Sequence, residues 1–152
     1  MPPDPSTTSA PSAGLGAVLC LFVIGAIAAI IVLGARSARR GRDARAAAAW
    51  QNLLAVAHAR PDAHVCRVSH VYQRAHRGSK AVILWAASGR RQDTWFWYFS
   101  PAAGSTLLIS GVVGFGPHNQ NPNVFYVESG GVLMSAPPGA EAAWRRFQRA
   151  AR

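Results

Sequence analysis

The longest uninterrupted hydrophobic run of the chain extends from Leu15 to Leu33, and no charged residue occurs between Asp4 and Arg36. A helix rises about 1.5 Å per residue, so about twenty residues cross a hydrocarbon core of about 30 Å. A buried core helix is the alternative, but a domain this small could hardly surround one on every side. The pattern therefore predicts a transmembrane helix over residues 14–35.

The segment does not resemble a cleaved signal peptide, which begins with a positive region and has a shorter apolar stretch. Residues 1–13 contain no Lys or Arg. Cys20 follows Val18 and Leu19, so it lacks the small residues that precede a lipoprotein cysteine. We expect the helix to be retained, with residues 1–13 as a disordered extracytoplasmic tail.

Five arginines follow the hydrophobic run within a basic juxtamembrane segment, residues 36–45. Lys and Arg beside a span stay on the cytoplasmic side. We therefore expect a single-pass protein of the cell (plasma) membrane, with its N-terminus outside and residues 46–152 in the cytoplasm. Each arginine near the surface is expected to gain about 1 kcal/mol from anionic head groups. The five are Arg36, Arg39, Arg40, Arg42 and Arg45.

Two amphipathic helices are predicted in the cytoplasmic domain. The first covers residues 46–60, with one apolar stripe at helical spacing, and ends before Pro61. No proline lies between Pro11 and Pro61, so this helix is able to continue the membrane span, with Gly41 as the weakest point. The second covers residues 140–151; its stripe is Ala140, Ala143, Trp144, Phe147, Ala150 and Ala151.

Between these helices the pattern changes to strand-like runs separated by short turn signals. The links are too short for a crossover, which predicts an antiparallel meander. Gly130 and Gly131 are expected to form the turn of a last hairpin. The predicted fold is α+β, with about six antiparallel strands flanked by an N-terminal and a C-terminal amphipathic helix. The runs are 65–74, 81–88, 94–100, 105–113 and the hairpin 123–135.

The run TWFWYFS, residues 94–100, contains five consecutive aromatic residues. Strand alternation would place Trp95, Trp97 and Phe99 on one face, and Phe96 and Tyr98 on the other. The neighbouring runs are also apolar on both sides, unlike a sheet with one solvated face. The two helices can cover one face. The other requires closure of the sheet, a partner chain or the membrane surface.

The charge balance is strongly basic: sixteen Lys and Arg oppose six Asp and Glu. In a meander, the basic residues near Arg74, near Arg90 and in the C-terminal helix would form three separate groups. Such dispersed charge argues against a nucleic-acid groove and favours a solvated surface near an anionic bilayer. Proteins that stack the bases of single-stranded nucleic acid also place basic residues among their aromatic residues. Residues 94–100 contain no basic residue.

Candidate catalytic and metal-binding residues are few. His58, His64, His70 and His76 recur every six residues. Six residues of strand span about 20 Å, whereas zinc–nitrogen bonds are about 2 Å long. We therefore expect no metal site, no cofactor and no catalysis. Acids are too scarce for a two-carboxylate mechanism, and Cys66 with a histidine is the remaining enzymatic alternative.

A long polar loop, within residues 111–123, is the candidate binding loop. Its glycines follow a strand but do not open a helix, as a phosphate-cradling loop requires. Long loops in small domains are often functional, although a plain connection is an equal alternative. The candidate residues are Gly114, Gly116, His118, Asn119, Gln120, Asn121 and Asn123.

Together these features favour a single-pass membrane protein that presents a small basic cytosolic domain for binding a protein or anionic lipid. A membrane-tethered enzyme using Cys66 with a histidine is one alternative. A membrane-associated nucleic-acid-binding protein is the other.

Overall fold

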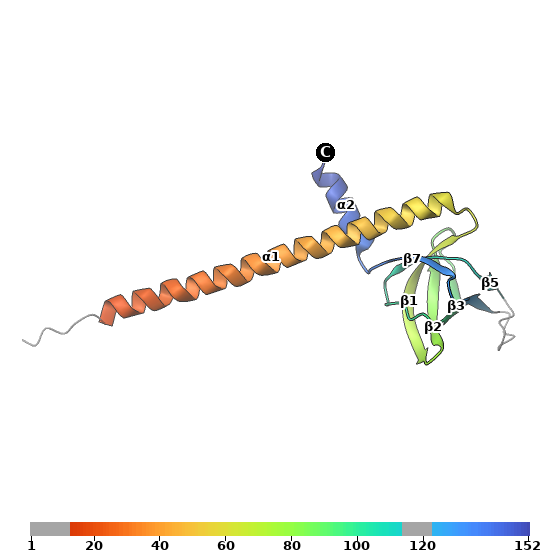
Figure 1. The fold of residues 1–152 in the computed structure, drawn as a ribbon, viewed down its shortest axis with the longest axis horizontal. Coiled ribbons are helices and arrows are strands. Elements are labelled where there is room, and N and C mark those ends of the chain that lie inside the picture. Colours follow the sequence, from red (N-terminus) through yellow and green to blue (C-terminus); the bar gives the residue numbers. More distant parts are fainter. Residues whose placement is uncertain (1–12, 114–122) are drawn as a thin grey trace, which may run out of the picture. The chain divides into compact units, whose positions relative to one another are not determined.

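The computed structural model describes residues 13–113 and 123–152, with side chains from residue 27 onward except those of Ala28 and Val113. In these residues the fold is α+β, as predicted, with two helices and a curled sheet (Figure 1). The chain divides into two compact units, one that ends at Arg40 and one that extends from Gly41 to Arg152.

Helix α1 (Ala13–Ala59) precedes the sheet and helix α2 (Ala140–Ala150) follows it. Between them the described residues form seven strands, joined in the order β5-β6-β3-β2-β1-β4-β7. Their bounds are β1 (His64–Ala75), β2 (Gly78–Trp85), β3 (Arg91–Trp97), β4 (Thr106–Ile109), β5 (Val112–Val113), β6 (Val124–Val127) and β7 (Val132–Ala136).

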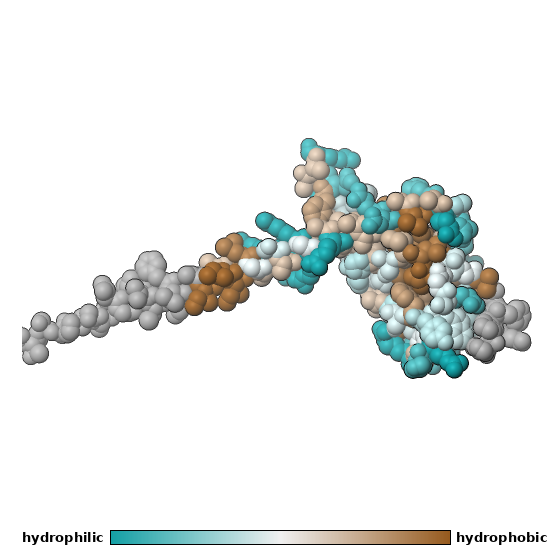
Figure 2. All heavy atoms as spheres, viewed as in Figure 1, coloured by the Kyte–Doolittle hydropathy of each residue, from teal (hydrophilic) through white to brown (hydrophobic). Residues whose placement is uncertain are grey.

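The first unit exposes an apolar stretch of α1 within residues 27–33, where Ile30, Ile31 and Leu33 are each more than half exposed (Figure 2). Within the side chains that the structure describes, no helix is both long enough and apolar enough to cross a membrane. Most of the predicted span, residues 14–26, lies outside those side chains. The transmembrane helix therefore stays a prediction.

The first three strands form the antiparallel hairpins that the turn signals predict. The meander prediction is wrong beyond that point, because β4 pairs with β1 and not with β3. Passing from β3 across two strands requires about 15 Å at the usual strand spacing. Residues 98–105 are long enough to make that passage. The sheet is mixed and not purely antiparallel, since β6 runs parallel to β3.

The predicted hairpin over residues 123–135 is also wrong. Strands β6 and β7 do not pair with each other; β6 pairs with β5, and β7 with β4. Gly131 instead forms a corner, where its carbonyl accepts a 2.8 Å hydrogen bond from the Ser110 N–H. A Cβ atom at Gly131 would lie 2.7 Å from the Ser110 carbonyl oxygen, so the close approach requires glycine.

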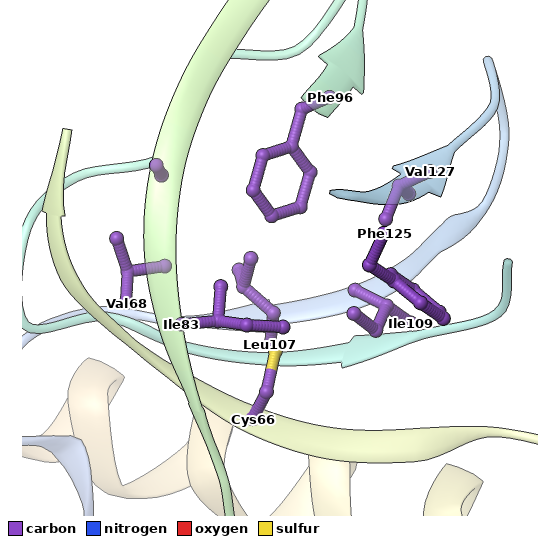
Figure 3. Packing of buried hydrophobic residues seen from close by; sticks show 9 residues of the cluster. Cys66, Val68, Ile83, Phe96, Leu107, Ile109, Phe125 and Val127 are labelled. Carbon is purple, nitrogen blue, oxygen red and sulfur yellow. The ribbon is translucent and has the colours of Figure 1, made fainter. Parts of the chain in front are cut away.

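This corner allows the sheet to curl on itself, because β6 lies beside β3 while β7 continues to β4 and β1. Side chains from five strands point into the space that the curl encloses (Figure 3). The buried residues of this inner core are Cys66, Val68, Ala81, Ile83, Phe96, Leu107, Ile109, Phe125 and Val127.

A second core lies on the outer side of the sheet, where the helices cover it. Leu53 of α1 is fully buried in a cluster with Leu108, Ala136 and Ala140. Strand alternation separates the two cores, since Leu107 and Ile109 face inward and Leu108 faces the helices. The predicted stripe of residues 46–60 is confirmed where Ala46, Trp50 and Ala57 pack on this cluster.

The aromatic run departs from simple alternation at Tyr98. Strand β3 ends at Trp97, and Tyr98 adopts a left-handed backbone conformation (φ 51°) with its side chain 68% exposed. This reversal turns Phe99 toward the inner core, with its ring centroid 6.0 Å from that of Phe96. The prediction that Phe99 shares a face with Trp95 and Trp97 is therefore wrong.

Gly78 provides a test of the β1–β2–β3 packing. A Cβ atom there would lie 2.0 Å from the Phe96 carbonyl oxygen, and φ is +148°. We expect Gly78→Ala to destabilise the fold by at least about 3 kcal/mol, because backbone clash adds to conformational strain. Thermal unfolding followed by circular dichroism measures the loss.

Gly89→Ala is the matched control, since Gly89 has a φ of +66° but no atom within 4 Å of an added Cβ. It should cost about 1–2 kcal/mol, from the backbone conformation alone. Equal melting temperatures for the two variants would contradict the close strand approach at Gly78.

Candidate functional site

The predicted binding loop lies almost wholly outside the described residues: Gly114, Gly116, His118, Asn119, Gln120 and Asn121 are not described. Asn123 is exposed just before β6, and its backbone carbonyl accepts a hydrogen bond from Gln92 Nε2. This hydrogen bond connects the C-terminal end of the loop to β3. The binding role of the loop stays a prediction.

The five predicted lipid-contacting arginines are all exposed on α1. Arg36, Arg39 and Arg40 belong to the first unit, and Arg42 and Arg45 to the second. The Arg45 Nε atom donates a 3.2 Å hydrogen bond to the Gly41 carbonyl oxygen one turn earlier. The contact of these arginines with lipid stays a prediction.

An ion pair joins this basic segment to α2. Asp43 Oδ2 lies 3.0 Å from Arg146 Nη2, although 103 residues separate the two in sequence. The sequence pattern predicts a separate group for the C-terminal arginines. The structure instead brings one of them, Arg146, against the Gly41–Ala59 part of α1.

The apolar stripe of α2 is covered along only half of its length. Ala140 and Ala143 are buried, whereas Phe147 is 46% exposed. Beside Phe147 lies a hollow of about 410 Å³, which we call the α1–α2 groove. Helix α1 lines it with Ala44, Ala47, Ala48 and Gln51, and the α2 side consists of Trp144, Phe147, Gln148 and Ala151.

A second hollow, of about 580 Å³, adjoins the groove and shares Trp144 and Gln148 with it. Its other lining residues are Arg145, Arg149 and Arg152, and we call it the arginine hollow. Glu141 pairs with Arg145 at 2.5 Å. The buried Trp144 indole N–H meets no acceptor among the described residues, and an unsatisfied donor of this kind costs about 1–3 kcal/mol.

A further hollow, of about 620 Å³, lies where β3 begins, between Trp85, Arg90 and Asn123. Asp93 lines it and accepts a 2.7 Å hydrogen bond from the Tyr72 hydroxyl. Partial burial, with this hydrogen bond, raises the pKa of Tyr72 to about 12. Tyr72 therefore remains a neutral donor at physiological pH, and the hollow adjoins the end of the predicted loop.

The environment of Cys66 is that of a structural cysteine. Its side chain is fully buried in the inner core, and burial raises the pKa of the thiol to about 12. Reactive cysteines have a lowered pKa and partial exposure. His64 packs edge-on against Trp85, with ring centroids 5.7 Å apart. Across the described residues, no three His, Cys, Asp or Glu side chains gather as a metal site would require.

Comparison with family models, with curated proteins and with solved structures finds no match for this chain. The chemistry of its own residues therefore carries the functional inference.

The buried thiol gives a direct test of the Cys66 alternative. In a Cys20→Ser background at pH 7, Cys66 should react with iodoacetamide at least about a hundredfold more slowly in the folded than in the unfolded protein, because reaction requires opening of the core. Labelling is followed by mass spectrometry. Rapid labelling of the folded protein below pH 7 would identify an activated thiolate and favour the enzymatic alternative.

The Asp43–Arg146 pair tests the docking of α2 on α1. Both side chains are about half exposed, so the pair should contribute about 0.2–1 kcal/mol. We expect Asp43→Arg to destabilise the protein, and the exchanged double variant Asp43→Arg/Arg146→Asp to recover most of the loss. Denaturant unfolding of the four proteins in a double-mutant cycle measures the coupling, and a coupling of zero would contradict the contact.

Proposed function

We propose that the chain is a single-pass membrane protein whose residues 14–35 span the bilayer, with a non-catalytic binding domain on the cytoplasmic side. The observation that carries this proposal is the charge-free run from Leu15 to Leu33, followed at once by a cluster of exposed arginines. Such a run matches the thickness of a bilayer, and such a cluster marks its cytoplasmic end.

The binding surface of the domain is basic. Arg42 and Arg45 of α1 and the arginines of α2 are exposed, and they belong to helices that the Asp43–Arg146 pair connects. Positive charge beside the cytoplasmic leaflet attracts anionic head groups. The domain therefore serves as a module for anionic lipid, with a protein partner as a second class of ligand.

The alternatives have less support. The burial and raised pKa of Cys66 work against a thiol-dependent enzyme. Basic residues do gather at α2, as nucleic-acid binding would require. They border an apolar groove, however, and an apolar groove complements an amphiphile better than a polyanion with a solvated backbone.

Membrane integration is tested with a pair of substitutions in the middle of the hydrophobic run. The natural chain should stay in the membrane pellet after alkaline carbonate extraction. Ile24→Arg/Ala28→Arg should move it to the soluble fraction, because each central arginine costs about 2.5–3.5 kcal/mol of insertion free energy. Immunoblotting of both fractions gives the distribution.

Ile24→Leu/Ala28→Leu is the control and should remain in the pellet. Protease added to intact cells should remove an epitope tag at the N-terminus and leave one at the C-terminus. Extraction of the natural chain by carbonate would contradict the membrane span, and the reverse tag accessibility would contradict the orientation.

A further inference from the structure

We infer that the α1–α2 groove and the arginine hollow together bind one molecule of an anionic phospholipid. Part of an acyl chain lies in the groove, and the head-group phosphate lies among the arginines. This inference rests on the proposed function, since it requires the domain to lie at a membrane, and it assigns that membrane contact to one defined site.

The groove has the chemistry of an acyl-chain site. Ala44, Ala47 and Ala48 present methyl groups, which leave the surface of α1 open, and Phe147 of α2 forms the opposite wall. Phe147 remains half exposed despite belonging to the apolar stripe of α2. The groove, of about 410 Å³, is open to solvent, and its lining is mostly apolar with a few polar groups, as in sites for small ligands.

The arginine hollow supplies the polar end. Arg145, Arg149 and Arg152 face it, and guanidinium groups bind phosphate through paired hydrogen bonds. Glu141 offsets one of these charges, so the hollow keeps a positive balance. Trp144 lines both hollows, and its buried indole N–H has no acceptor among the described residues. An ester or phosphate oxygen at this junction would satisfy that donor.

Charge complementarity selects a lipid over a second copy of the chain. Two α2 faces in contact would bring like-charged arginines together, which disfavours association. A helix rich in arginine with Trp and Phe beside the charges is also typical of the membrane interface. Ala44 follows Leu33, the last residue of the hydrophobic run, by eleven residues. At about 3.5 Å per residue, the chain cannot carry the groove more than about 40 Å from that residue.

The test measures binding of pyrene-labelled phosphatidylglycerol to the full-length protein in a non-ionic detergent, with labelled phosphatidylcholine as the neutral comparison. Binding should saturate at one lipid per chain and favour phosphatidylglycerol by about tenfold. Ala48→Trp fills the groove from an exposed position and should weaken phosphatidylglycerol binding by at least about tenfold. Arg149→Gln should reduce the preference for the anionic lipid to about twofold or less.

Matched controls separate the site from general effects. Ala55→Trp adds the same side chain at another exposed alanine of α1, and Arg77→Gln removes the same charge from the β1–β2 turn. Both should bind phosphatidylglycerol within about twofold of the natural chain. Circular dichroism of all four variants verifies that each is folded.

Equal weakening by Ala48→Trp and Ala55→Trp, or equal binding of the two lipids by the natural chain, would overturn the inference. Displacement of the labelled lipid by an acidic helical peptide but not by unlabelled phosphatidylglycerol would assign the groove to a protein partner and overturn it too. Carbonate extraction of the natural chain keeps the two proposals distinct. If the natural chain shows no selective lipid binding but stays in the membrane pellet, the lipid site alone is refuted, whereas its extraction by carbonate refutes the membrane anchor.

Discussion

The need to bury both faces of the sheet determines the structure of the second unit. Strands β1 to β4 carry apolar side chains on both faces of the sheet. Exposing either face to water would cost about 25 cal/mol of folding free energy for each Å² of apolar area. The corner at Gly131 lets the sheet close over its inner face, and the helices cover part of the outer face. The positions of β4 to β7 and of both helices follow from that requirement.

One consequence concerns the role of helix α1. Its part from Gly41 onward belongs to the second unit, where Leu53 is fully buried against Leu108 and Ala136. This segment is therefore a core element of the domain and not a linker to it. Of the apolar stripe of α2, Ala140 and Ala143 are buried, whereas Phe147 and the groove remain at the surface. The candidate site thus lies on the part of the helical layer that does not pack against the sheet.

Local patterns predicted the elements well, and long-range pairing poorly. The stripes of residues 46–60 and 140–151 and the β1–β2–β3 hairpins follow from helical spacing and turn residues. Gly130 and Gly131 predict a hairpin turn from the sequence alone, because a corner between strands uses the same residue type. Tyr98 has no sequence signal for its left-handed backbone, so the inward turn of Phe99 was missed. The Asp43–Arg146 contact joins residues 103 positions apart, which no local pattern specifies.

Only part of the candidate site could be predicted from the sequence. The five juxtamembrane arginines are exposed, as charges clustered within ten residues require, whereas the groove depends on how α2 packs. The groove was not predicted, and the available signal for it in the sequence is an aromatic residue near the end of an amphipathic stripe, Phe147 beside Arg146 and Arg149. That signal does not predict that α1 supplies the alanine-lined side of the groove.

Hydrogen–deuterium exchange of the full-length protein tests most directly whether the end of α1 is part of the domain core. The account predicts that the amides of Leu53 and its neighbours open with the same free energy as those of Val68 and Leu107, because all belong to one cooperative unit. Exchange should then be slowed by at least about a thousandfold relative to an unfolded chain at all of these positions. Fast exchange from Ala46 to Ala57, with the strands still protected, would contradict it.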